Sequence, residues 1–190
     1  MLIASFDVGA SSTKIAVSDE EGRIILRGIG PHGNPFAIGI NKVVERIHKM
    51  YIEIVDSISR DIDIAIFGLT GYSIPLISAL RKKFSTCNCE IIVLDDKVFT
   101  LESALGGKDC VVVYAGTGSF VITRDPSGNI VTSGNKGYIL GDEGGGFYIS
   151  HKAIKLYIRS LDGREESSEF TEEIGRSLLK IYKASTIDEL

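Results

Sequence analysis

A short stretch of small residues between two largely apolar runs constrains this chain more than any other feature. Residues 7–14 read DVGASSTK, with residues 2–6 before them and residues 15–17 after them. Such a stretch predicts the turn of a β-hairpin, and its backbone N–H groups and hydroxyls suit a phosphate group. Asp7 precedes the turn, where a carboxylate is useful if a cation shares the site. We therefore expect Asp7 beside Mg²⁺.

The same stretch also fits an ordinary structural turn. Any strand that is followed by a Gly/Ser turn and a second strand forms a hairpin. Taken alone, the stretch leaves both interpretations open, and other parts of the chain must decide between them.

The composition favours a globular protein that acts on small molecules. The chain has 190 residues, 44% of them hydrophobic, which suits one large domain or two small ones. Its formal net charge of −4 gives no general attraction to nucleic acid or to an anionic membrane. The apolar runs are far shorter than the roughly 20 residues that cross a bilayer. We expect no nucleic-acid partner and no membrane partner.

The cysteines favour a reducing compartment. Cys87, Cys89 and Cys110 leave one cysteine unpaired in any disulfide scheme. We see no basic and apolar leader before Leu2. The expected location is therefore the cytoplasm.

The first half of the chain predicts a sheet of antiparallel and parallel strands. A third strand follows the hairpin and makes a meander, and GIGPHGNPF (residues 28–36) is loop by composition. Residues 40–58 keep the apolar spacing of a helix. A buried strand, a helix and another strand then make a β-α-β succession. The third strand is predicted at residues 24–26. In the β-α-β succession, the strands are predicted at 62–69 and 90–94 and the helix between them at 74–84. A short helix is predicted at 101–105.

Polar residues stand where the expected parallel strands end. Thr70 and Gly71 follow one strand, and Asp95 and Asp96 follow the next. Ligands of open α/β sheets bind beyond the carboxyl ends of the strands. The two aspartates also fit an exposed turn pair that caps the following helix.

The strand pattern restarts after Gly106 and Gly107, which we take as a domain boundary. A second meander with a Gly/Thr/Ser turn appears roughly 105 residues after the first, which suggests two similar domains that each present a hairpin turn to a cleft between them. We expect domains at residues 1–107 and 108–190. The predicted strands of the second meander are 111–114, 120–123 and 130–132, with turns at 116–119 and 126–129.

A glycine-dense segment, residues 134–146, precedes a helix at 147–161. Asp142 and Glu143 lie in its middle. Glycines before a helix N-terminus suit an anion or a hydroxyl group. The two acids equally fit the first turn of a helix, where the dipole favours negative charge. A charged segment and an amphipathic helix at residues 170–182 follow.

These motifs together resemble the N-acetylglucosamine kinase branch of the actin-like ATPase superfamily, a branch that also includes the ATPase activators of benzoyl-CoA reductase and of hydroxyacyl-CoA dehydratases. Five segments occur in the family's order across nearly the whole chain. They are the first phosphate motif (7–13), the sugar loop (28–34), the site of the catalytic aspartate (95–96), the second phosphate motif (116–119) and the signature GYILGDEGGG (137–146).

The resemblance implies an α/β fold of the ribonuclease H-like, actin-like ATPase kind. Two domains are expected, with mixed sheets in which an antiparallel three-stranded meander joins parallel strands. The second domain is expected to be incomplete, because members of the family continue beyond the point that corresponds to Leu190. The last helix has an apolar face that needs a partner, so we expect a homodimer if the chain is complete.

The resemblance also implies an enzyme that phosphorylates a sugar hydroxyl with ATP and Mg²⁺. Asp96 would take the proton from the hydroxyl, with Asp95 as the alternative base. The residues implied to bind the sugar are Asn34, Gly71, Thr117, Gly137 and Asp142. The residues implied to surround the ATP phosphates are Gly9, Ala10, Ser11, Ser12, Thr13, Gly116, Thr117, Gly118 and Ser119, with Asp7 on the metal side.

Two further functions stay open at this stage. An ATPase activator of a partner enzyme would need cysteine ligands for an interfacial cluster, and Tyr114 stands where such a ligand is expected. The second possible function is that of a non-catalytic relative that binds a sugar or a nucleotide.

Asn34 before Pro35 also fits the start of a helix or turn without any ligand. Lys14 is interpreted as a solvated charge at a strand end.

Overall fold

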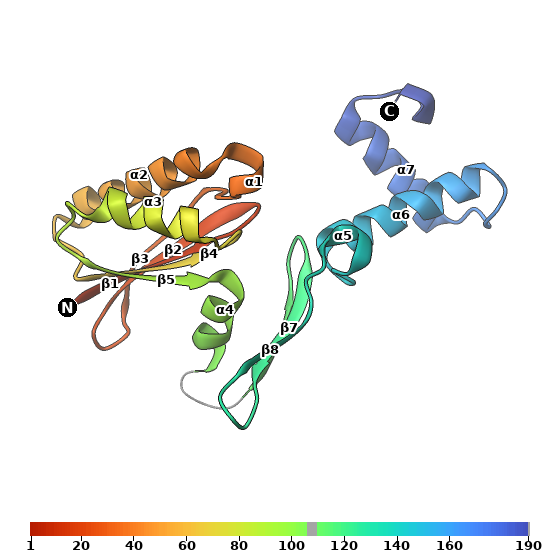
Figure 1. The fold of residues 1–190 in the computed structure, drawn as a ribbon. Coiled ribbons are helices and arrows are strands. Elements are labelled where there is room, and N and C mark those ends of the chain that lie inside the picture. The colour runs from red at the N-terminus through yellow and green to blue at the C-terminus, as the bar shows by residue number, and fades with distance from the viewer. Residues whose placement is uncertain (106–109, 190) are drawn as a thin grey trace. The chain divides into compact units, whose positions relative to one another are not determined.

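A computed structural model describes residues 1–105 and 110–189 of the chain, and Figure 1 shows their helices and strands. The chain divides into two compact units, Met1–Val112 and Val113–Leu190. The predicted boundary at Gly106 and Gly107 lies outside the described residues.

The first unit is built on a five-stranded sheet in the order β3-β2-β1-β4-β5. Its first three strands form an antiparallel meander, and β4 and β5 run parallel to β1. This confirms the predicted combination of a meander with parallel strands. The bounds are β1 Leu2–Val8, β2 Ser12–Asp19, β3 Ile24–Pro31, β4 Ile64–Leu69 and β5 Glu90–Asp95.

Helices cover both faces of this sheet. The helices α2 (Ile40–Ile58) and α3 (Ile74–Phe84) lie on one face, and α4 (Asp96–Leu105) lies on the other (Figure 1). Alternate side chains of β1 are buried and join the core with those of α2 and α3, so the main core lies on the face that these two helices cover. The bounds of α2 and α3 agree with the predicted ranges. Among the described helices, none is long and apolar enough to cross a membrane.

The prediction that residues 28–36 form a loop was wrong for their first part, because β3 continues to Pro31. β2 begins at Ser12 and pairs with Pro31, so the third strand is as long as the second. Glycine weakens a strand, but it also allows another element to approach closely. A Cβ at Gly30 would overlap Met50 of α2. The glycine therefore belongs to a strand on which a helix packs.

The prediction of a short helix at residues 101–105 was also too narrow. The helix α4 begins at Asp96, directly after β5. The Asp95 carboxylate accepts a hydrogen bond from the Lys97 backbone N–H at 3.0 Å, which satisfies one of the free donors of the first helical turn. The helix therefore starts five residues earlier than its apolar pattern indicated.

The second unit contains most of a three-stranded sheet in the order β6-β7-β8, of which β6 begins two residues before the unit does. β7 and β8 are antiparallel, which agrees with the predicted second meander. The glycine-dense segment contains a helix, α5, that was not predicted. A Cβ at Gly175 would lie 2.5 Å from the Tyr157 ring, so α6 and α7 pack closely. The bounds are β6 Val111–Ala115, β7 Ser119–Arg124, β8 Ile130–Gly134, α5 Gly137–Leu140, α6 Gly146–Leu161, α7 Glu169–Tyr182 and a final 3₁₀ turn, Ile187–Glu189.

Candidate functional site

The turn between β1 and β2 is closed by its own backbone. The Gly9 N–H donates to the Ser12 carbonyl oxygen at 3.0 Å, and a Cβ at Gly9 would lie 2.9 Å from that oxygen, so the position requires glycine. Ala10 and Ser11 are exposed at the bend. Thr13 is buried, and its hydroxyl donates to the Pro31 carbonyl oxygen at 2.8 Å. The Thr13 hydroxyl thus holds β2 to β3.

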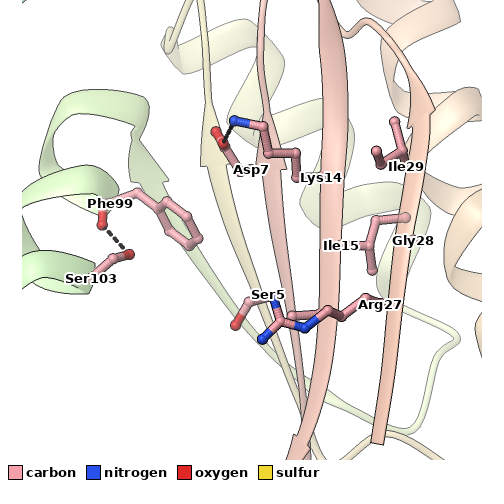
Figure 2. A pocket seen from close by; sticks show the side chains of 10 residues that line it. Ser5, Asp7, Lys14, Ile15, Arg27, Gly28, Ile29, Phe99 and Ser103 are labelled. Carbon is pink, nitrogen blue, oxygen red and sulfur yellow. Dashed lines mark hydrogen bonds and ion pairs between the residues drawn. The ribbon is translucent and has the colours of Figure 1, made fainter. Parts of the chain in front are cut away.

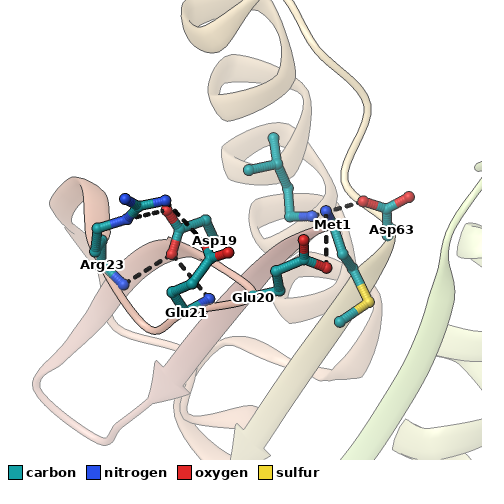
Figure 3. Close-up of polar contacts among 7 residues, drawn as sticks. Met1, Asp19, Glu20, Glu21, Arg23 and Asp63 are labelled. Carbon is teal, nitrogen blue, oxygen red and sulfur yellow. Dashed lines mark hydrogen bonds and ion pairs between the residues drawn. The ribbon is translucent and has the colours of Figure 1, made fainter.

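Asp7 and Lys14 lie opposite each other across this hairpin and form an ion pair of 3.6 Å (Figure 2). The interpretation of Lys14 as a solvated charge missed this partner, although the pairing register of a short hairpin is the signal that could have found it. Both side chains line a pocket of about 680 Å³ together with Phe99 and Ser103 of α4. Mg²⁺ in nucleotide sites is held by one or two carboxylates plus phosphate oxygens and waters, so the single carboxylate of Asp7 fits such an ion.

The loop before α1 (Pro35–Ile38) is attached to the same turn. The Gly33 N–H donates to the Gly9 carbonyl oxygen at 3.1 Å, and a Cβ at Gly33 would overlap Val8. Asn34 caps α1, since its Oδ1 accepts from the Phe36 N–H at 3.0 Å. Among residues 1–105 and 110–189, the Nδ2 group of Asn34 has no hydrogen-bond partner. Asn34 therefore starts a helix and keeps a donor for a ligand.

The end of β4 lies against this loop. The Thr70 N–H donates to the Val8 carbonyl oxygen at 3.0 Å. Gly71 has a positive φ of 66°, and a Cβ there would lie 2.5 Å from Cγ of Pro35. The structure thus brings Gly71 beside the loop that contains Asn34, as expected if both contact one ligand.

Asp96 and Asp95 have different surroundings although they are adjacent. Asp95 caps α4, and Lys97 Nζ lies 3.1 Å from its carboxylate and 4.0 Å from that of Asp96. Burial raises the pKa of Asp96, and the negative charge of Asp95 adds to this, while Lys97 and a hydrogen bond with Thr70 oppose it. A half-buried carboxylate with a raised pKa is a suitable proton acceptor.

Contacts therefore connect three of the predicted site residues at the carboxyl edge of the first sheet. Gly9 is bonded to the loop of Asn34, and that loop packs on Gly71. Thr70, the neighbour of Gly71, is among the groups that lower the pKa of Asp96 and so oppose the effect of burial. Thr70 and Lys97 were not assigned roles from the sequence. Their positions directly after a strand end and directly after two aspartates are the signals that could have indicated them.

In the second unit, the turn after β6 is bound to the N-terminus of α6. The Gly116 N–H donates to the Gly118 carbonyl oxygen at 2.8 Å and closes the turn. The Gly146 and Phe147 N–H groups donate to the carbonyl oxygens of Gly116 and Thr117 at 2.7 and 3.2 Å. The Ser119 hydroxyl donates to the Glu143 carbonyl oxygen at 2.7 Å. The second predicted phosphate turn and the glycine-dense segment therefore form one local structure.

Asp142 is the most informative residue of this structure. Its φ of 60° is unusual for a residue other than glycine, and a Cβ at Gly118 would lie 2.6 Å from its Oδ2. Its Oδ1 is buried and has no hydrogen-bond partner among the described residues. A buried acceptor without a donor costs free energy, so a ligand hydroxyl or cation is expected there.

Gly137, also predicted to bind the sugar, is the first residue of α5. Its carbonyl oxygen accepts from the Gly141 N–H at 2.9 Å, one residue before Asp142. Its φ is 81°, and a Cβ there would meet open space. The position therefore favours glycine for its backbone conformation, and its role with a ligand stays a prediction.

Two meanders, each with a small-residue turn, and carboxylates at the strand ends define a protein of the actin-like ATPase fold. A model of the BadF/BadG/BcrA/BcrD ATPase family matches residues 6–188, and the chain belongs to this family. The predicted resemblance and fold class are thereby confirmed.

Individual relatives are kinases by description. The chain is 38% identical over 79 residues to an N-acetylmuramic acid/N-acetylglucosamine kinase of Clostridium acetobutylicum, a match that covers 42% of this chain and 26% of the relative. Among solved structures, a candidate N-acetylglucosamine kinase from Chromobacterium violaceum is similar with a TM-score of 0.77 and 22% identity, over 95% of this chain and 63% of that one. A ROK family glucokinase from Streptomyces griseus, solved with glucose and AMPPNP, has a TM-score of 0.57 and 16% identity, over 85% and 62% of the two chains.

At these identities the two structures show the fold alone. The chain spans about a quarter of the curated relative and less than two thirds of the two structures. Relative to these structures, the second domain is partial, as the resemblance implied.

Proposed function

We propose that the protein transfers the terminal phosphoryl group of ATP to a hydroxyl group of N-acetylglucosamine or a related hexose or amino sugar. The observation that carries this proposal is the buried and unpartnered Oδ1 of Asp142 beside the turn of residues 116–119. A sugar hydroxyl would supply the missing donor next to a turn suited to phosphate. The kinase activity named for the Clostridium acetobutylicum relative supports this choice of reaction.

Asp96 is the proposed general base. Its raised pKa means that the ionised carboxylate binds a proton more tightly than an ordinary aspartate does. It takes the hydroxyl proton as the sugar oxygen bonds to the γ-phosphorus and the bond from that phosphorus to the ADP oxygen breaks. Asp95 stays the alternative, but its carboxylate already caps α4 and is paired with Lys97.

The proposed phosphate sites are the two turns. The N–H groups of Gly9 and Gly116 and the hydroxyls of Thr13 and Ser119 are bonded within the protein, so the phosphates are proposed to contact the remaining polar groups of residues 9–13 and 116–119. Lys14 adds a positive charge that Asp7 positions. Asp7 is the proposed protein ligand of Mg²⁺, which when bound neutralises negative charge on the phosphates.

Polar groups that suit a sugar hydroxyl occur in each unit. Asn34 offers its Nδ2 donor and Asp142 its Oδ1 acceptor. Gly71, Thr117 and Gly137 are proposed to approach the sugar with their backbones. We also propose a cytoplasmic location, as the cysteine usage indicates.

The ATPase-activator function has less support. Tyr114, which stands where a cysteine ligand was expected, stacks its ring on Phe120 with centroids 4.9 Å apart. An aromatic side chain packed in this way offers no ligand for an iron–sulfur cluster. The kinase is therefore the function that we carry forward.

The test is ATP turnover screened against a panel of sugars, with and without EDTA. We expect turnover with an amino sugar or hexose that EDTA abolishes. Asp96→Asn should lower turnover by about 100-fold or more and leave sugar binding intact, because the base is lost but the contacts remain. Asp95→Asn is the comparison, since a larger loss of turnover in this variant would identify Asp95 as the general base. ATP hydrolysis that no sugar stimulates would reject the kinase, and sugar binding without turnover would favour a non-catalytic relative.

A further inference from the structure

We infer that Phe36 is a sugar-binding residue whose ring packs on the apolar C–H face of the acceptor sugar. This inference rests on the proposed kinase function and deepens it. Phe36 lies between Asn34 and Gly71, the two residues of the first unit that were predicted to bind the sugar. It belongs to the four-residue helix α1 (Figure 1).

The backbone of Phe36 is firmly held. Its N–H donates to Oδ1 of Asn34 at 3.0 Å, and the preceding Pro35 packs on Gly71. Cε2 of Phe36 lies 3.2 Å from the position that a Cβ at Gly71 would occupy. The absence of a side chain at Gly71 therefore leaves the room that the ring uses.

The side chain of Phe36 contributes little to the folded core. It is 89% exposed, the highest value among the large apolar side chains of the described residues. A single exposed apolar residue needs no explanation in general. The position of this one is informative, because the Nδ2 donor of Asn34, two residues away, lacks a partner in the described part of the chain.

A ring next to a free amide donor matches the chemistry of a pyranose. One face of such a sugar presents C–H groups, and its rim presents hydroxyls. Aromatic side chains bury apolar area at low cost in conformational entropy, and a few placed polar groups then set the orientation of the ligand. Asn34 would bind a hydroxyl of the rim while Phe36 contacts the face.

The experiment is calorimetric titration of glucose and of N-acetylglucosamine into the full chain, with AMPPNP present. Phe36→Ala should lower the affinity for both sugars by about tenfold, which corresponds to the loss of one aromatic contact. Phe36→Trp should restore the affinity, because it restores a ring. The melting temperature and the affinity for AMPPNP should not change, since the side chain is exposed. Phe170→Ala removes a ring of α7 that is also exposed and should have no effect on sugar binding.

Four outcomes would overturn the inference, and they are distinguishable. If the wild-type chain binds a sugar and Phe36→Ala binds it equally well, the inference fails and the kinase stands. If Phe36→Ala weakens N-acetylglucosamine alone, the ring contacts the acyl group and not the sugar face. If it weakens AMPPNP as much as the sugars, the residue supports the fold of the site. If the wild-type chain binds neither sugar, the proposed function fails together with the inference.

Discussion

Asp96 and Asp125 have pKa values that the fold shifts in opposite directions. Burial, reinforced by the charge of Asp95, raises the pKa of Asp96. Asp125 lies in the turn between β7 and β8, where hydrogen bonds from Asn129, first from its side chain and then from its backbone, lower the pKa of Asp125. The first carboxylate is destabilised as an ion and the second is stabilised, so one fits proton transfer and the other fits a structural turn.

We predict opposite stability effects when each of these carboxylates is replaced by an amide. The folded chain binds the proton of Asp96 more tightly than the unfolded chain does, so stability falls as pH rises from the ordinary aspartate value through the raised pKa. Asp96→Asn removes this cost and should raise the melting temperature at neutral pH. For Asp125 the ionised carboxylate contributes stability above the ordinary pKa of aspartate, and this contribution is lost as pH falls through the lowered pKa. Asp125→Asn should therefore lower the melting temperature at neutral pH.

Melting curves from pH 3 to pH 8 would show whether each substitution raises or lowers the melting temperature as predicted. Each variant should approach the wild-type chain as the pH becomes acidic, because the wild-type carboxyl is then neutral as well. A loss of stability in Asp96→Asn at neutral pH would contradict the raised pKa. The same variant should lose turnover, so activity and stability should change in opposite directions.

At the scale of elements, glycines decide how closely β3 approaches its neighbours. Gly30 faces Met50 of α2 without room for a side chain, whereas a Cβ at Gly28 would be 3.8 Å from the nearest atom of Ile15. The first glycine is required by packing and the second is not. The two positions belong to one strand, so they form a matched pair.

Gly30→Ala should therefore destabilise the chain by about 1 kcal/mol, because the new methyl group forces the side chain of Met50 to shift within the core. Gly28→Ala should change the free energy of unfolding little. Urea denaturation of the two variants measures the difference. Equal stability of both variants would show that Met50 can move aside at no cost.

At the scale of the whole molecule, the two units differ in how much apolar surface they bury. The first unit has a continuous core from its sheet to α2 and α3. In the second unit, Ile139 and Leu140 of α5 and Ile181 of α7 are all more than 70% exposed. An exposed apolar helix face suits association. We therefore propose that a second copy of the chain covers the apolar face of α7, giving the homodimer expected if the chain is complete.

Sedimentation velocity should show a dimer that dissociates on dilution. Ile181→Glu should shift the equilibrium towards the monomer, because it places a charge in the proposed contact. Ile29→Glu, at a residue of β3 that is 81% exposed, should leave the dimer unchanged. A wild-type chain that stays monomeric at all concentrations would refute the proposal.

Local pattern was enough to predict most elements and the family. The helices at residues 40–58 and 74–84 and the two meanders follow from the spacing of apolar side chains, and the family follows from five short motifs in order. The wrong predictions lie where local composition misleads. The glycines of β3 are typical of a loop, because their contact with Met50 cannot be predicted from the sequence. The helix α4 begins at the residue that follows its cap, Asp95, and not at its first apolar residue.

The chemistry of the candidate site depended on contacts between distant residues. Residue types in the order of the family's motifs, together with the resemblance that they carry, named Asp7, Asn34, Asp96 and Asp142 as candidates. The pairing of Asp7 with Lys14 needed the strand register, the raised pKa of Asp96 needed its burial, and the unpartnered oxygen of Asp142 needed the packing of two loops. Register, burial and packing arise from the whole folded chain, because each depends on residues far away in the sequence, and a local motif carries no information about them.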